Sequence, residues 1–190
     1  DLANVPERDV PGEPHRSVSA PVVFTLPTLA DAARQNSQFE QQAFTGLQQL
    51  IDLVLEYNCG EIARMLERKP EMMYFGDDLG MQDRLAIGEH KWRRYLKPCY
   101  ARMYGLCHVA GANVYMHTDG HIVPIIRDLI ECGVNVLNPQ IRANGLASLV
   151  RECKGKVCIN LDLDRQLFPF ASPRDIDDHV RECVAALGAP

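Results

Sequence analysis

The sequence lacks the features that mark nucleic-acid-binding and membrane-spanning proteins. It has no dense run of Lys and Arg interleaved with aromatic residues, and its formal net charge is -5 at pH 7. A surface that binds nucleic acid normally concentrates positive charge. No apolar run approaches the roughly 20 residues that span a bilayer, and the amino terminus carries no signal-peptide core. We therefore expect a protein that acts on a small molecule, with no nucleic acid and no membrane among its partners.

A pattern of paired cysteines is also missing. The seven cysteines are scattered, and no CxxC pair occurs among them. An odd number in irregular positions suits free thiols in a reducing compartment better than a disulfide framework. This pattern favours a cytoplasmic location.

The first twenty residues show no sign of regular structure. Residues 1–20 carry three prolines among polar residues and have no hydrophobic periodicity, which predicts an extended arm or linker. Residues 21–190 are expected to form one globular domain. The composition of the whole chain, 46% hydrophobic and 24% charged, is ordinary for such a domain.

From residue 21 onward the chain repeats one unit, a short apolar strand followed by an amphipathic helix. The strands are predicted at 21–26, 72–75, 114–117, 134–137 and 157–161. Strands that alternate with helices at such short spacings must pair in parallel, with helices covering the sheet. The predicted class is therefore α/β. A closed (β/α)8 TIM barrel has eight strands and usually about 250 residues, so we expect a partial barrel.

Three of the expected helices have features that the structure can test. The first carries an apolar stripe that is interrupted near Cys59, and its residues are Leu47, Leu50, Ile51, Val54, Leu55, Ile62, Met65 and Leu66. The second covers 89–109 and bends at Pro98. The third has Ser172 as its N-cap and turns four apolar residues inward, namely Ile176, Val180, Val184 and Leu187.

Polar side chains recur where the predicted strands end. They are Asp77 and Asp78, His117 and Asp119, Asn138 and Gln140, and Asp162 and Asp164. The carboxyl ends of parallel strands meet at one face of a barrel, where active sites are built from several loops. We therefore expect these residues to surround one substrate pocket.

The strongest candidates are His117 and Asp119. Two residues apart on an extended strand end, they point to the same side. Together with Asp78 they can offer one nitrogen and two or more oxygens to a divalent metal ion, a mixture that zinc accepts. These three residues are the candidate catalytic and metal-binding group. In the structural alternative, Asp119 only caps the helix that begins near His121, and His117 is a hydrogen-bonded core residue.

Asp77 and Asp78 are adjacent, so on a strand end they face opposite ways and only one easily enters the pocket. We favour Asp78 for the metal. Asp77 is a candidate for substrate binding, and its alternative role is to cap the following segment or to pair with a surface arginine.

Amides and carboxylates after the later strands are further candidates for substrate binding. Asn138 and Gln140 offer amide groups to a substrate, or Asn138 and the proline after it form only a turn. Asp162 and Asp164 line the pocket, or they are loop residues that water solvates. The sequence leaves both pairs of alternatives open.

Four segments, in this order, resemble the second half of the uroporphyrinogen decarboxylase superfamily. They are GDDLG at 76–80, WRRYLKPCY at 92–100, HTDGHIVPIIRDLIECGVNVLNPQ at 117–140 and FASPRDIDDHV at 170–180. The resemblance extends over about residues 21–187. It implies a (β/α)8 barrel, in agreement with the strand spacing, and an activity of one of two kinds, tetrapyrrole decarboxylation or corrinoid-dependent methyl transfer.

The motifs of these two branches differ in what they imply for this chain. The superfamily's decarboxylases hold substrate carboxylates with amino-terminal arginines and a Gly-His-Gly segment, and this chain has no counterpart of either. Residues 76–78, Gly-Asp-Asp, stand where those enzymes carry a serine motif. The methyltransferases bind zinc through a His-x-Cys-Gly motif and a later cysteine. This chain reads His-Thr-Asp-Gly at 117–120, so the resemblance implies a zinc ligand at His117, with Asp119 in place of the cysteine.

Three functions follow from these observations. The first is metal-assisted methyl transfer between a small substrate and a corrinoid or thiol, with zinc as the expected metal and a corrinoid protein as a partner. The second is decarboxylation of uroporphyrinogen or a similar polycarboxylate. The third is a catalytically silent barrel that binds a tetrapyrrole or a partner subunit. The sequence favours the first, and a homodimer is compatible with each.

Overall fold

The computed structural model describes residues 29–188 and divides the chain into two compact units, 1–42 and 43–190. Helix α1 (Leu29–Leu66) begins in the first unit and ends in the second. The predicted arm at 1–20 and the predicted strand at 21–26 lie outside the described residues. The sheet and the candidate site belong to the second unit.

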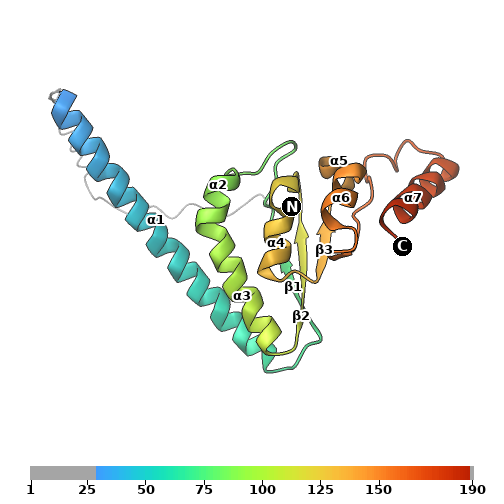
Figure 1. The fold of residues 1–190 in the computed structure, drawn as a ribbon, viewed down its shortest axis with the longest axis horizontal. Helices are drawn as coiled ribbons and strands as arrows, with labels where there is room; N and C mark the ends of the chain where they lie inside the picture. Colours follow the sequence, from blue (N-terminus) through green and yellow to red (C-terminus); the bar gives the residue numbers. More distant parts are fainter. Residues whose placement is uncertain (1–28, 189–190) are drawn as a thin grey trace, which may run out of the picture. The chain divides into compact units, whose positions relative to one another are not determined.

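Four parallel strands form one sheet, in the order in which they follow one another along the chain. They are β1 (Met72–Gly76), β2 (Asn113–Thr118), β3 (Val136–Pro139) and β4 (Cys158–Ile159). Figure 1 labels the first three of them. A helical crossover between consecutive neighbours is the arrangement that parallel pairing requires. The predicted α/β class and the partial (β/α)8 arrangement are therefore confirmed.

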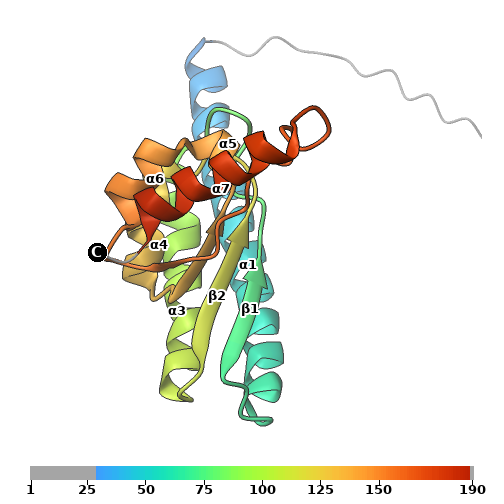
Figure 2. The same cartoon turned by 90° about the vertical axis from the view of Figure 1, so that its right-hand side faces the viewer.

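Helical segments connect the strands. Between β1 and β2 lie α2 (Glu89–Lys91), the π-helical turn η1 (Trp92–Leu96) and α3 (Lys97–Val109). The later segments are η2 (Val123–Ile125), α4 (Ile126–Cys132), α5 (Ile141–Asn144), α6 (Leu146–Cys153) and α7 (Pro173–Leu187). Figure 2 looks onto the face of β1 and β2 that is opposite to α1 and α3. Within residues 29–188, no helix has both the length and the apolar character needed to cross a bilayer.

The irregularity predicted at Pro98 lies in the turn before it. η1 is a single π-helical turn, and Pro98 follows in the first turn of α3. Because proline has no N–H to donate to the preceding turn and its ring needs space there, a wider turn accommodates it. Arg93 and Lys97 from this stretch bind the buried carboxylate of Asp128 at 2.9 and 2.7 Å, which ties the stretch to α4.

The alternation of side chains along β2 separates the core from the candidate site. Val114, Met116 and Thr118 are fully buried, whereas Tyr115 and His117 project to the opposite face and are half-buried. The buried side chains lie on the face of the sheet that α3 covers. Each large apolar side chain buried there contributes about 1.5–3 kcal/mol to stability. The other face of β2 is left for polar groups.

The apolar stripe of α1 is less buried than the sequence predicts. The helix continues through Cys59 without the expected interruption, and Cys59 and Ile62 are buried. The stripe residues that remain exposed are Leu47, Leu50, Val54 and Met65. An apolar stripe covers an arc of roughly 100° or more, and the described neighbours of the helix cover only part of that arc.

Helix α7 begins as predicted and differs from the prediction near its end. The Ser172 hydroxyl accepts from Asp175 N at 3.3 Å, and Asp175 Oδ2 accepts from Ser172 N at 2.8 Å, which forms a capping box. The expectation that Val184 faces inward is wrong, since this residue is 64% exposed while Cys183 is buried. Val184 borders a groove between α7 and β4 that no described strand fills.

Candidate functional site

Two hydrogen bonds fasten the loop after β1 to the end of β2. Gly80 N donates to Asp119 O at 3.1 Å. The buried Thr118 hydroxyl accepts from Leu79 N at 3.2 Å. The loop therefore follows β2 beyond the end of the sheet, and this path brings Asp78 close to Asp119.

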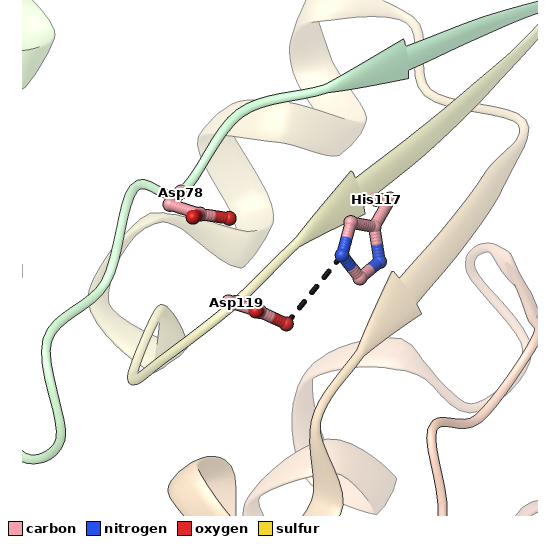
Figure 3. Close-up of side chains that lie close together, drawn as sticks. All are labelled: Asp78, His117 and Asp119. Atoms are coloured by element: carbon pink, nitrogen blue, oxygen red, sulfur yellow. Dashed lines mark ion pairs between the residues drawn. The ribbon is translucent and has the colours of Figure 1, made fainter. Parts of the chain in front are cut away.

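Asp78, His117 and Asp119 form one compact group (Figure 3). One potential ligand atom from each residue lies within 4.8 Å of those of the other two. His117 Nε2 is 3.4 Å from Asp119 Oδ1. The imidazole and the Asp119 carboxylate are half-buried, and Asp78 is exposed. The spacing of two residues on a strand end thus places His117 and Asp119 on the same side, and the metal-binding role of the group stays a prediction.

Asp119 does not act as a helix cap. The next helical segment, η2, has Ile122 at its N-cap position, and no side chain caps it. The Asp119 carboxylate instead accepts a hydrogen bond from Gln140 Nε2 at 2.6 Å. It also lies 3.7 Å from the Arg165 guanidinium. Its neighbours are therefore groups of the site and not the start of a helix.

The Asp77 side chain points toward helix α3, which carries Tyr100. The Tyr100 hydroxyl donates a hydrogen bond to Asp77 Oδ2. Burial and the nearby Asp77 carboxylate raise the pKa of Tyr100 above its ordinary value, so the phenol keeps the proton that it donates. Of the two adjacent aspartates, only Asp78 joins the group with His117, as the alternation of an extended chain requires.

Asn138 and Gln140 contact the candidate metal ligands directly. Asn138 lies within β3, paired in register with His117, and its Oδ1 atom is 2.7 Å from His117 Nδ1. Its Nδ2 group donates to Asn160 O at 2.5 Å. Gln140 provides the amide that binds Asp119. The structure thus gives both amides protein partners, which the sequence pattern alone does not reveal.

A pocket of about 540 Å³ opens beside this group. This volume lies within the range of about 300–1,000 Å³ that is typical of small-molecule sites. Five of the predicted residues line it, namely Asp78, Asp119, Gln140, Asp162 and Asp164. Asp77, His117 and Asn138 are not among its lining residues. Residues that follow several strands therefore converge on one pocket, and His117 adjoins it through its contact with Asp119.

Two arginines that sequence reasoning missed also line the pocket. Arg142 donates to Asp164 Oδ2 at 2.9 Å, and Arg165 lies 3.2 Å from Asp162 Oδ2. Desolvation raises the pKa of Asp164, but hydrogen bonds from Arg142 and from the backbone lower this pKa by more. The net pKa of Asp164 therefore lies below its ordinary value. Both arginine side chains are more than half exposed. Each arginine comes within two residues of a predicted polar site residue, Gln140 or Asp164. This position is the only sequence signal for it.

Comparisons with known proteins give one positive result. The family model described as Uroporphyrinogen decarboxylase (URO-D) matches residues 38–190, which is most of the chain. Comparisons with curated proteins and with solved structures gave no match. The matched region includes all four described strands and every residue of the candidate site, and it agrees with the resemblance of the four sequence segments.

Proposed function

The chain belongs to the uroporphyrinogen decarboxylase family. On this basis we propose that side chains at the ends of its strands bind a divalent metal ion, zinc, and that the reaction is methyl transfer. A small substrate occupies the pocket, and a thiol or a corrinoid carried by a partner protein exchanges the methyl group with it. The observation that carries this proposal is the group of Asp78, His117 and Asp119 at the ends of two neighbouring strands.

The donor atoms of this group fit a zinc ion. Zinc binds imidazole nitrogen and carboxylate oxygen at about 2.0–2.2 Å, so two ligands of a tetrahedral ion are about 3.4 Å apart. The distance between His117 Nε2 and Asp119 Oδ1 is 3.4 Å. Asp78 is exposed, so its carboxylate has room to move toward the other two. Three protein ligands are the number that catalytic zinc sites use, with a further position left for substrate or water.

The residues of the site would have different roles in the reaction. When bound, the metal would supply Lewis acidity, which lowers the pKa of the thiol or alcohol group that exchanges the methyl group. Arg142 and Arg165 place positive charge on the wall of the pocket and can orient an anionic part of the substrate through charge-assisted hydrogen bonds. Gln140 holds the Asp119 carboxylate in place.

Metal analysis of four purified proteins tests the metal site. They are the wild type, His117→Ala, Asp119→Ala and, as a matched control, Asp77→Asn. Asp77 is adjacent to Asp78 but is hydrogen-bonded to Tyr100, so its amide variant leaves the candidate ligands unchanged. We expect about one zinc per chain in the wild type and the control, as for a single catalytic site, and little in the other two. Equal metal content in all four proteins would refute the site.

A spectroscopic assay separates methyl transfer from other reactions. Demethylation of methylcobalamin is followed in the presence of a small thiol, with the zinc-loaded wild type and the same variants. We expect demethylation that depends on His117 and Asp119 and is retained in Asp77→Asn. Spectra that stay unchanged for a zinc-loaded wild type would contradict methyl transfer from a corrinoid while leaving the metal site intact.

Decarboxylation is favoured by a different observation, the two arginines of the pocket. Guanidinium groups recognise carboxylates in a bidentate manner, and Arg142 and Arg165 both line the pocket. In this second function they would hold the carboxylates of a polycarboxylate substrate. Release of CO₂ from uroporphyrinogen by the wild type, lost in Arg142→Gln and Arg165→Gln, would support it. The absence of CO₂ release from the wild type would exclude this substrate.

A further inference from the structure

We propose that Asn138 and Gln140 are positioning residues of the metal site rather than substrate-binding residues. Asn138 sets which nitrogen of His117 carries the proton, and Gln140 fixes the orientation of the Asp119 carboxylate. This inference rests on the metal binding of the proposed function and deepens it, because it assigns roles to two residues that are not metal ligands.

The hydrogen bonds of Asn138 determine the tautomer of His117. Asn160 O is a backbone carbonyl and can only accept, so the side-chain atom 2.5 Å from it must be the amide nitrogen of Asn138. Asn138 Oδ1 therefore faces His117 Nδ1, at 2.7 Å. Since Oδ1 can only accept, Nδ1 must carry a hydrogen. In the neutral ring the lone pair is then on Nε2.

This tautomer directs a lone pair at a carboxylate. His117 Nε2 is 3.4 Å from Asp119 Oδ1, and in the neutral ring neither atom carries a hydrogen between them. Two acceptors at this distance are complementary to a cation that lies between them. Histidines that bind metals usually donate their second N–H to a carbonyl or carboxylate oxygen, which fixes the ring and the tautomer. Asn138 Oδ1 supplies that acceptor here.

The hydrogen bonds of Gln140 fix the orientation of the Asp119 carboxylate in a similar way. Gly120 N can only donate, so the atom 3.0 Å from it is Gln140 Oε1. The Gln140 amide nitrogen is then directed at Asp119 Oδ1, at 2.6 Å. Each end of the amide makes one hydrogen bond within the protein, so Gln140 is fixed between the backbone and the carboxylate. A substrate can meet only the second N–H or the second lone pair of the amide, which these two contacts leave over.

The sheet register explains why the two amides occupy these places. His117 pairs with Asn138 across β2 and β3, and Thr118 pairs with Pro139. Asp119 and Gln140 come directly after Thr118 and Pro139, the last residues of β2 and β3. Residues at spacing two share one face of a strand, so each candidate ligand from β2 meets one amide from β3.

Asn138 is tested by three variants of the full chain and two measurements. Asn138→Ala removes the acceptor for His117 Nδ1, Asn138→Asp keeps an oxygen there, and Asn160→Ala alters a side chain that donates to Tyr115 at 2.8 Å. Zinc affinity is measured by competition with a chelator, and the tautomer of the metal-free neutral ring by nitrogen NMR. Thermal unfolding checks that each variant is folded.

We expect the wild-type ring to carry its hydrogen on Nδ1. Asn138→Ala should bind zinc about 10- to 100-fold more weakly and lose this preference, the usual effect of removing such a partner. Asn138→Asp and Asn160→Ala should stay within about threefold of the wild type, below that range. Zinc binding by Asn138→Ala equal to that of the wild type, or a wild-type hydrogen on Nε2, would overturn the role inferred for Asn138 and leave the proposed function standing. A wild type that binds no zinc would overturn the proposed function as well.

Gln140 is tested separately with Gln140→Met, which keeps the length of the side chain and removes both hydrogen bonds. We expect zinc affinity to fall by about tenfold, at the low end of the range for partners of metal ligands, while the Nδ1 tautomer of His117 stays as in the wild type. An unchanged zinc affinity in a folded Gln140→Met protein would remove Gln140 from the site.

Discussion

Gly80 and Gly120 are in direct backbone contact. A Cβ atom on either residue would overlap the main chain at the other, and Gly120 has a φ of +79°. The contact lies beside the hydrogen bond from Gly80 N to Asp119 O. Since Asp78 is two residues before Gly80 and Asp119 is one residue before Gly120, this approach of two loops sets the separation of the two carboxylates.

The variant Gly120→Ala should disturb both the fold and the metal site. Its positive φ and the missing space are each expected to cost about 1 kcal/mol or more. Chemical denaturation measures the loss of stability, and chelator competition measures weaker zinc binding. Gly105→Ala is the matched control, because a Cβ at Gly105 meets nothing within 4 Å; in a helix it should be neutral or stabilise by about 0.5–1 kcal/mol. Equal unfolding midpoints for the two variants would contradict this account.

Arg165 would compete with the proposed metal ion for the Asp119 carboxylate. Its guanidinium is 3.7 Å from Asp119 Oδ1 and 3.2 Å from Asp162 Oδ2, with the arginine side chain 62% exposed. An exposed ion pair contributes at most about 1 kcal/mol, so Arg165→Gln should bind zinc up to about fivefold more tightly.

The control for this prediction is Arg142→Gln. Arg142 lines the same pocket but pairs with Asp164, which is not a candidate ligand. Its zinc affinity should match the wild type within about twofold, the spread expected for a change in an exposed pair. Chelator competition measures both variants at the same ionic strength, and weaker zinc binding by Arg165→Gln would show that Arg165 supports the site instead.

The buried Asp128 carboxylate should give stability that depends on pH. Desolvation raises the pKa of Asp128, but hydrogen bonds from Lys97 and Arg93 outweigh it and leave the pKa below its ordinary value. A carboxyl group whose pKa is lowered by folding stabilises the protein above its unfolded pKa of about 3.9, and this contribution is lost as the pH falls through the folded pKa.

We therefore expect Asp128→Asn to destabilise the protein by about 1–3 kcal/mol at pH 7, the range for hydrogen bonds to charged groups. The difference from the wild type should shrink below about pH 3.9. Urea unfolding at several pH values measures it. Glu89→Gln serves as the control, because Glu89 is an exposed partner of Arg93 and should contribute less than about 1 kcal/mol. A difference that is constant with pH would argue against the charged form of Asp128.

Local periodicity was sufficient to predict the class of fold and, to within two residues, where the four described strands end. A strand alternates its side chains whatever it pairs with, so the separation of Asp77 from Asp78 and the common side of His117 and Asp119 follow from the sequence alone. The Ser172 cap is equally local. These features depend on the backbone of a single segment.

Contacts between distant segments could not be predicted in this way. The burial of an apolar stripe depends on what packs against it, which is why Val184 and much of the α1 stripe are exposed against expectation. The partners of Arg142 and Arg165 depend on how the loops after the strands are folded, and a sequence pattern does not give their path.

The sequence by itself determined that polar residues gather at the carboxyl ends of parallel strands, and that His117 and Asp119 project together from one of them. The tertiary structure alone decided that Asn138 meets His117, that Gln140 meets Asp119, and that two glycines bring Asp78 to the same place. The physical reason is register. Alternation along a strand is fixed by its own backbone, whereas the residue that lies opposite is fixed only when two strands pair.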